Sequence, residues 1–233
     1  AREPEISDLC HCLNAMGAKI SGIDSTTLTI VGVDALHHTE HSIMADRIEA
    51  GSYAIAGAMT GGSVTLKDID ATIMSSTLDA LRQMGVEVDI TDDGITISAS
   101  STPLKGINLK TQPYPGFATD MQAQFMALAT IVPDTSVINE SIFENRFMHV
   151  PELMRMGANI TVSGNTATVR GVDQLKGAPV MATDLRASMS LVLAGLAAEG
   201  ETEVNRLYHL DRGYEDLEQK LGQLGANVER VNG

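Results

Sequence analysis

The sequence contains no tryptophan, only two cysteines and 3% aromatic residues. Two cysteines cannot form a disulfide-rich scaffold. The longest apolar stretch, residues 189–198, is too short to span a membrane and is interrupted by Ser190 and Gly195. Basic residues are also scarce, because 16 Lys and Arg stand against 30 Asp and Glu, which gives a net charge of −14. This acidic balance argues against a general nucleic-acid or anionic-membrane surface, so we expect neither partner.

What the chain does contain is typical of a globular protein. Its 233 residues are 43% hydrophobic and 20% charged, which excludes disordered and fibrous classes and allows one large domain or two ordinary ones. No basic segment followed by an apolar one marks a secretory signal at the start. We therefore expect a soluble protein of the cytoplasm.

A short pattern recurs four times along the chain. A helical stretch ends in Met or Leu, a glycine follows, and a strand is predicted after the glycine. The glycines suit helix C-caps in the left-handed conformation. They recur at nearly even intervals, at Gly17, Gly85, Gly157 and Gly225. The sequence therefore predicts a repeated α/β unit.

The two helices of each unit differ in character. The first helices, predicted over 120–132 and 184–198, are apolar nearly all round and should be buried. The second helices, predicted over 76–84 and 216–224, are amphipathic and should lie on a surface. Paired strands with alternating apolar residues follow the second helices and should be antiparallel. These pairs are predicted within 19–32, 86–98 and 160–170. We expect an α/β (α+β) fold with buried helices inside and mixed sheets outside.

Three units begin with a first helix, whereas residues 1–36 supply only the second half of another unit. The chain starts at Ala1 and enters a helical pattern almost at once. We therefore expect a C-terminal piece of a longer protein.

An aspartate opens each first helix, at Asp46, Asp120 and Asp184. One interpretation is that all three are N-caps, since Asp accepts hydrogen bonds from free backbone N–H groups there. The other is that the three helix starts converge on one cleft that binds an anion. Arginines stand near these positions and could contact phosphate or carboxylate through two hydrogen bonds each. They are Arg47, Arg186 and Arg212.

Longer strings resemble the UDP-N-acetylglucosamine 1-carboxyvinyltransferase (enolpyruvyl transferase) family. The segments that carry the resemblance are Arg-Glu-Pro-Glu-Ile at 2–6, Thr-Asp-Met-Gln-Ala-Gln-Phe at 119–125, Ile-Phe-Glu-Asn-Arg-Phe-Met-His-Val at 142–150, Ala-Thr-Asp-Leu-Arg-Ala-Ser at 182–188, and Tyr-His-Leu-Asp-Arg-Gly-Tyr-Glu at 208–215. They run from one end of the chain to the other. The related shikimate enzymes share the repeat architecture but not these strings.

The resemblance implies a two-domain enzyme made of six inside-out α/β units. Residues 1–44 would complete the first domain, residues 45–233 would form most of the second, and a hinge would lie near residues 44–47. Such an enzyme transfers the enolpyruvyl group of phosphoenolpyruvate to the 3-hydroxyl of UDP-N-acetylglucosamine and releases phosphate, in the first committed step of peptidoglycan synthesis. Both substrates, and the missing N-terminal half, are the partners expected. The resemblance implies no redox cofactor and no metal.

The resemblance also assigns individual residues. Asp120 would be the general base at the sugar hydroxyl, and Ile142 would contact the sugar nucleotide through its backbone. Arg212 would meet phosphoenolpyruvate. Asp184, Leu185 and Arg186 match a segment of the cleft, and Arg146 would also face it. Phe143 and Phe147 are interpreted as packing residues.

The family's general acid is a cysteine that lies upstream of this chain. Cys10 and Cys12 fall in a predicted helix and are interpreted as packing residues, so the isolated chain is expected to be inactive. The segment 37–41, which contains three histidines, could suggest a metal site, but a solvated loop is the favoured interpretation. Two alternatives stay open: a shikimate-type transferase on the same fold, and a non-catalytic binding module.

Overall fold

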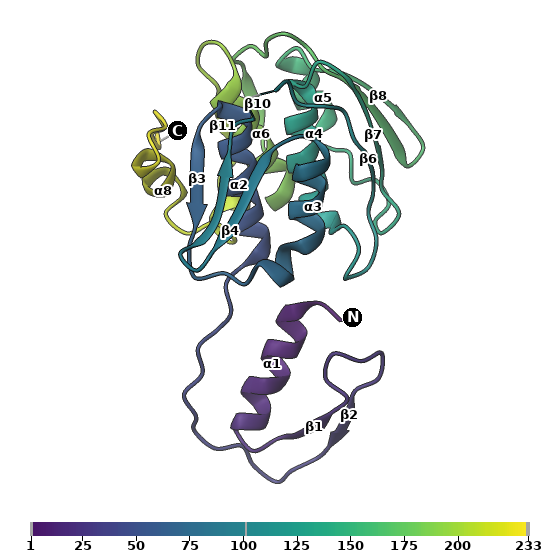
Figure 1. Cartoon of the computed structure of the whole chain (residues 1–233), viewed down its shortest axis with the longest axis vertical. Helices are drawn as coiled ribbons and strands as arrows, with labels where there is room; N and C mark the ends of the chain where they lie inside the picture. The colour runs from purple at the N-terminus through teal and green to yellow at the C-terminus, as the bar shows by residue number, and fades with distance from the viewer. Residues whose placement is uncertain (1, 101, 232–233) are drawn as a thin grey trace.

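The computed structural model describes residues 2–100 and 102–231. It consists of a main body and a smaller N-terminal segment, which are joined by an extended connecting segment (Figure 1). The N-terminal segment contains helix α1 (Pro4–Ala15) and the antiparallel pair β1 (Lys19–Ser21) and β2 (Thr29–Val31). Residues 32–46 then lead into the main body without a helix or strand.

Three helices form the centre of the main body. They are α2 (Arg47–Thr60), α4 (Gln122–Thr130) and α6 (Leu185–Ala197), and each contacts the other two. All nine residues of α4 are buried. Small residues allow the close packing, since a Cβ atom at Gly51 would lie 2.8 Å from Cε of Met121. The prediction of buried first helices is confirmed.

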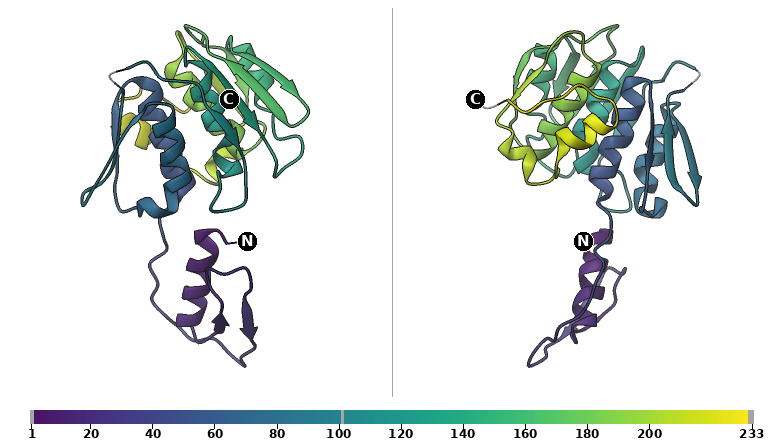
Figure 2. Two further views of the ribbon diagram at one scale, coloured as in Figure 1. Left: turned by 45° about the vertical axis from the view of Figure 1, so that its right-hand side comes forward. Right: turned by 90° about the vertical axis from the view of Figure 1, so that its left-hand side faces the viewer.

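Three sheets lie outside these helices (Figure 2). The first has the antiparallel order β3-β5-β4 and the second the mixed order β6-β7-β9-β8, in which β6 and β7 are parallel. The third pairs β10 and β11 in parallel. The strands are β3 (Ser63–Leu66), β4 (Glu87–Thr91), β5 (Gly94–Ser98), β6 (Asn108–Lys110), β7 (Thr135–Asn139), β8 (Asn159–Ser163), β9 (Thr166–Arg170), β10 (Pro179–Met181) and β11 (Glu203–Asn205). The expected inside-out arrangement, with mixed outer sheets, is therefore present.

The remaining helices are short and lie toward the surface of the main body. They are α3 (Ser75–Gln83), which follows the 3₁₀ helix η1 (Ala71–Met74), and α5 (Val150–Arg155), α7 (Tyr208–Asp211) and α8 (Leu217–Gln223). The four repeated glycines all have a positive φ, between 92° and 99°, next to a helix end. This is the left-handed conformation that glycine adopts without a steric penalty, and it confirms them as helix terminators.

One predicted element is absent: residues 226–231 form no strand after Gly225. The helix predicted over 120–132 is present as α4, but it is preceded by a 3₁₀ turn, η2 (Thr119–Met121), and ends at Thr130. No described helix combines the length and the apolar composition needed to cross a membrane.

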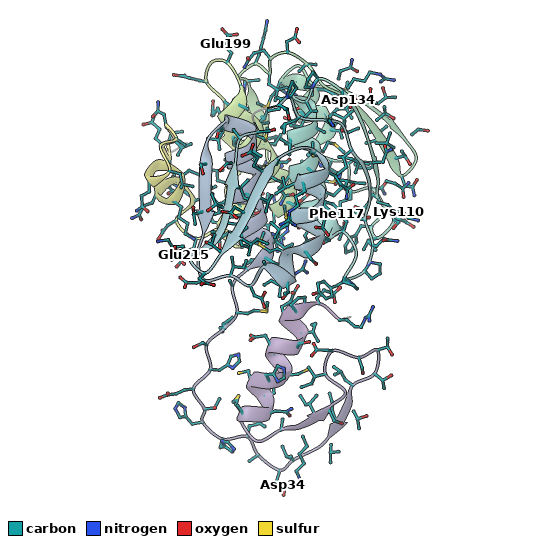
Figure 3. The ribbon with its side chains drawn as sticks, in the orientation of Figure 1. Asp34, Lys110, Phe117, Asp134, Glu199 and Glu215 are labelled. Atoms are coloured by element: carbon teal, nitrogen blue, oxygen red, sulfur yellow. The ribbon has the colours of Figure 1, made fainter. Side chains whose placement is uncertain are left out.

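The outer surface carries most of the charge. Figure 3 places Asp34 at the far tip of the N-terminal segment and Glu199 at the opposite end of the molecule. Phe117, in contrast, lies within the main body, where its ring meets that of Phe125 edge to face at a centroid distance of 5.0 Å. The acidic surface and the apolar centre are thus separated, as expected of a globular domain.

Candidate functional site

An open cavity of about 560 Å³ lies where the central helices begin. Polar and charged side chains dominate its wall. The lining residues are Asp120, Phe143, Glu144, Asn145, Arg146, Asp184, Leu185, Arg186 and Arg212. Six of the seven site residues expected from the sequence are among them, although they come from four separate parts of the chain. The tertiary structure therefore brings the resembling segments together at one place.

Asp120 is held between two arginines. Nη2 of Arg146 donates to its Oδ1 at 2.7 Å, and Nη2 of Arg186 donates to its Oδ2 at 2.7 Å. Each carboxylate oxygen thus accepts one charge-assisted hydrogen bond, the stronger class of such bonds. The side chain keeps 35% of its surface exposed, so it remains accessible from the cavity.

The charge state of Asp120 follows from two opposing effects. Partial burial acts to raise the pKa of Asp120, because it penalises the charged form. The charges and hydrogen bonds of Arg186 and Arg146 outweigh burial and hold the pKa of Asp120 below its ordinary value. Asp120 is therefore a carboxylate at neutral pH, but both of its oxygens are occupied.

Arg186 carries the complementary charge at the start of α6. Burial acts to lower its pKa, but Asp120 above all, with Tyr214 and Asp46, raises it above the ordinary value. Asp46 belongs to the start of α2 and Asp120 to the start of α4, so all three helix starts influence one guanidinium. Asp46 does not line the cavity itself, so the cavity wall contains residues from the starts of α4 and α6 but not of α2.

The three aspartates nevertheless differ in what they do locally. Asp46 accepts from the N–H groups of Ile48 and Glu49, and Asp184 accepts from those of Arg186 and Ala187. These two are N-caps, as the cap interpretation predicts. Asp120 caps nothing, because its oxygens bind arginine side chains instead, and the cap interpretation is wrong for this residue.

Arg212 reaches the cavity from the loop after α7. It is exposed and forms no ion pair with any residue in the described parts of the chain. Its position depends on a close approach, since a Cβ atom at the neighbouring Gly213 would lie 2.8 Å from Cδ2 of Leu185. Leu185 thus packs the Arg212 loop against the start of α6, and the guanidinium of Arg212 stays available to an anion.

Tyr214 anchors the same loop from beneath, a role that the sequence did not predict. Its ring is buried, and its hydroxyl lies 2.8 Å from Oγ of Ser52 on α2. Oγ of Ser52 donates to the carbonyl of Ile48, so the tyrosine hydroxyl donates to Ser52. The loop that carries Arg212 is thereby tied to the central helices.

Arg47 does not line the cavity, contrary to its expected role beside Arg186 and Arg212. It donates to the two carboxylate oxygens of Glu5 at 3.0 and 3.2 Å and lies 5.7 Å from the ring centre of Tyr114. Glu5 belongs to α1, so Arg47 connects the N-terminal segment to the main body. The guanidinium of Arg47 is thus engaged by the carboxylate of Glu5 and the ring of Tyr114, and it is not available to an anion in the cavity.

The loop between Ser141 and Phe147 supplies residues that were missed. Phe143, interpreted as packing, is 55% exposed and lies under the guanidinium of Arg146, 4.8 Å from its ring centre. Phe147 does pack against the core, as predicted. Ile142 does not line the cavity, and its N–H donates to Glu140. The neighbouring Glu144 and Asn145 do line it, although only their place inside the long matching string pointed to them.

Within the described residues no group of three potential ligands is arranged to hold a metal ion. In the segment with three histidines, Nε2 of His41 lies 3.1 Å from Asp8, while His37 packs against Gly17. Cys10 is buried on α1 and Cys12 is partly buried there, and neither lines the cavity. The contacts of these side chains are therefore with the N-terminal segment and not with the cavity.

The arrangement can therefore do two things: a carboxylate can accept a proton, and arginines beside it can bind carboxylate or phosphate. Both groups lie on one cavity wall, where central helices of the inside-out repeat fold begin. Residues 1–221 match the model of the family described as EPSP synthase (3-phosphoshikimate 1-carboxyvinyltransferase), and the chain belongs to this family.

Within the family, the chain is most informatively compared with bacterial UDP-N-acetylglucosamine 1-carboxyvinyltransferases. It is 62% identical over 232 residues to that of Sphingopyxis alaskensis and 59% identical over 233 residues to that of Zymomonas mobilis. Each alignment covers 100% of this chain and 54% of the relative. The chain thus spans about half the length of the curated relatives that it matches.

Solved structures agree on the fold. The enolpyruvyl transferase NikO from Streptomyces tendae matches 97% of this chain and 54% of its own, with a TM-score of 0.87 and 30% identity. EPSP synthase from Acinetobacter baumannii matches 82% of this chain and 44% of its own, with a TM-score of 0.60 and 22% identity. The second likeness concerns the fold alone.

Proposed function

We propose that this chain forms part of a UDP-N-acetylglucosamine 1-carboxyvinyltransferase, which moves the enolpyruvyl group of phosphoenolpyruvate to the 3-hydroxyl of the sugar and releases phosphate. The observation that carries the proposal is Asp120 between Arg146 and Arg186 on the cavity wall, in a chain 62% identical to a relative of that name. The product would enter peptidoglycan synthesis. The named relatives are bacterial, which favours the bacterial cytoplasm as the location.

Asp120 would take the proton of the sugar hydroxyl as that oxygen bonds to the enolpyruvyl carbon. A base must lie within hydrogen-bond reach of the proton that it removes. Because Oδ1 and Oδ2 are both engaged by arginines, the hydroxyl has to replace one of these contacts or share an oxygen. An incoming carboxylate or phosphate that attracts Arg186 would free Oδ2 of Asp120 and raise the basicity of this carboxylate, while Arg146 keeps it oriented.

Three arginines would receive the anionic substrate. Arg212 has no competing ion pair in the described residues, so we assign it the first contact with phosphoenolpyruvate. Arg186 can follow once it releases Asp120, whereas Arg146 stays on Asp120 and offers its remaining N–H groups to the anion. Asp184 would keep the start of α6 in place below them, and Leu185 would hold the Arg212 loop.

The domain assignment is also part of the proposal. Residues 1–44 would belong to a first domain and residues 45–233 to a second, with the hinge near residues 44–47. Two observations support it: residues 32–46 form no helix or strand, and several large apolar side chains near β2 are exposed. They are Leu28, Ile30, Val31, Val33 and Leu36. The missing half of the enzyme would cover them and would be this chain's main partner.

Phosphate release by the full-length protein that contains this chain tests the proposed activity. We expect release from phosphoenolpyruvate to require UDP-N-acetylglucosamine and not shikimate 3-phosphate. Release with shikimate 3-phosphate alone would establish the shikimate-type alternative. No release with either acceptor, together with no binding of the UDP-sugar by calorimetry, would favour a non-catalytic binding module.

The role of Asp120 is tested in the same assay. Changing Asp120→Ala should lower turnover by about 100-fold or more, the usual scale for a general base. Asp173→Ala is the matched control, since Asp173 is exposed and does not line the cavity. Turnover that stays unchanged in the Asp120 variant would reject its role.

A further inference from the structure

Glu140 is a buried carboxylate at the end of β7, only 2% exposed, and it lies outside the cavity wall. It accepts four hydrogen bonds. Oε1 accepts from the hydroxyl of Thr111 and the N–H of Ile142, both at 2.8 Å, and from the N–H of Phe143 at 3.1 Å. Oε2 accepts from the hydroxyl of Thr119 at 2.8 Å. A carboxylate is an acceptor only, and all four partners here donate to it.

These four donors come from three segments that the sequence keeps far apart. Thr111 follows β6, Thr119 begins η2, and Ile142 and Phe143 open the loop that carries Arg146. Thr111 adds to the assembly, because its hydroxyl oxygen also accepts from the N–H of Ser141 at 2.8 Å. One buried side chain thus holds the turn before Asp120 and the loop before Arg146 in a fixed relation.

Thr119 extends this arrangement to the site itself. Its hydroxyl donates its only proton to Glu140, so its oxygen is free to accept, and it accepts from Nη1 of Arg146 at 3.1 Å. Nη2 of the same guanidinium binds Oδ1 of Asp120. A continuous series of hydrogen bonds therefore runs from Glu140 through Thr119 and Arg146 to Asp120.

We propose that Glu140 is a positioning residue for the general base: through Thr119 it sets the orientation of Arg146, and Arg146 in turn sets the orientation and basicity of Asp120. This role rests on the proposed function. Glu140 itself touches no substrate, because it is buried behind the loop. The charged groups that share the cavity with Asp120 are Arg146, Arg186 and Arg212 together with Glu144 and Asp184.

Two variants separate this role from a contribution to folding alone. Glu140→Gln keeps the size of the side chain, but its amide nitrogen donates, so it cannot accept at both ends. Thr119→Val removes only the hydroxyl that links Glu140 to Arg146. Thr119→Ser restores a hydroxyl and is the conservative rescue, while Glu201→Gln, at an exposed site outside the cavity, is the matched control.

Turnover of the full-length protein as a function of pH is the decisive measurement. We expect Glu140→Gln and Thr119→Val to lower kcat by about 10- to 100-fold, the scale for a misplaced catalytic group. Because a loosened Arg146 stabilises the Asp120 carboxylate less, the acidic limb of the pH profile should move to higher pH. Thr119→Val should change kcat more than KM, and Thr119→Ser should recover most of the loss.

Hydrogen exchange provides a readout that does not depend on activity. In Glu140→Gln the amides of Ile142 and Phe143 should exchange faster, whereas Thr119→Val should leave them protected. An unchanged kcat and pH profile in Thr119→Val would overturn the proposal, even if Glu140→Gln fails to fold.

A wild-type protein without turnover would refute the proposed function and not this inference. In that case, NMR titration of the Asp120 carboxyl decides the inference. A higher pKa of Asp120 in Thr119→Val supports the series, and an unchanged pKa overturns it.

Discussion

At the scale of single residues, Asp120 shows how two partners decide a side chain's chemistry. An Asp at a helix start ordinarily caps the helix. Here the carboxylate oxygens bind two guanidinium groups, each 2.7 Å away, in place of the backbone N–H groups of the helix. The result is a carboxylate that is ionised at neutral pH and still partly exposed, as the proposed role of a base requires.

The lowered pKa of Asp120 predicts how acid affects stability. An unfolded Asp titrates near pH 3.9, and the folded value lies below it, so the ionised form stabilises the fold above about pH 3.9. This contribution is lost as pH falls through the folded pKa. The difference in unfolding free energy between wild type and Asp120→Asn should therefore be largest near neutral pH and should shrink below about pH 4.

Urea denaturation at a series of pH values measures this difference. Other acidic groups with lowered pKa values, such as Asp70 and Asp134, are present in both proteins and cancel. Asp173→Asn, at an exposed site outside the cavity, is measured as the control variant. A difference in unfolding free energy between wild type and Asp120→Asn that stays constant from neutral pH into acid would contradict a lowered pKa of Asp120 in the folded state.

At the scale of elements, the three central helices begin in two different ways. α2 and α6 start with a capping aspartate, whereas α4 starts through a 3₁₀ turn without a side-chain cap. The uncapped start is the one that carries the proposed base. Because Asp120 makes no cap hydrogen bond, both of its oxygens can accept from the two arginines.

The cap of α6 can be tested directly. Asp184→Ala should lower the unfolding free energy by about 1 kcal/mol, because the N–H groups of Arg186 and Ala187 lose their acceptor. Asp184→Asn should retain most of that stability, since Asn caps about as well. Urea midpoints compare the two variants, and an Ala variant as stable as the Asn variant would refute the cap.

At the scale of the whole molecule, the main body and the N-terminal segment differ in how much apolar surface they bury. The main body has a continuous buried core, whereas the segment buries little beyond Cys10 and Ile20 and leaves Ile30 67% exposed. The main links between the two are Arg47 with Glu5 and, more weakly, Arg2 with the carbonyl of Tyr114 at 3.4 Å. The segment is therefore suited to stabilisation by further protein.

The isolated 233-residue chain should release no phosphate from phosphoenolpyruvate and UDP-N-acetylglucosamine. The reason is chemical: the proposed base Asp120 is present, but neither cysteine of this chain lines the cavity, where the proposed reaction would need an acid. The full-length protein assayed in parallel is the positive control. Phosphate release by the purified chain above the background without enzyme would show that a group on this chain supplies the proton.

The sequence by itself determined the elements that depend on local patterns. A helix with apolar residues on every side has no polar face to turn to solvent, so the burial of α4 and α6 follows from their sequences. The glycine terminators and the caps at Asp46 and Asp184 also follow from preferences that act within a few residues. All nine residues that line the cavity lie within the resembling strings.

Only the tertiary structure decided which partner each charged group would take. Asp120 binds two arginines and does not cap its helix, and Arg47 pairs with Glu5. Glu140 is buried and accepts hydrogen bonds from two threonines and two backbone N–H groups. Several partners were compatible with each of these residues along the chain. The choice among them depends on distances across the fold, because the energies of ion pairs and hydrogen bonds are set by separation and burial.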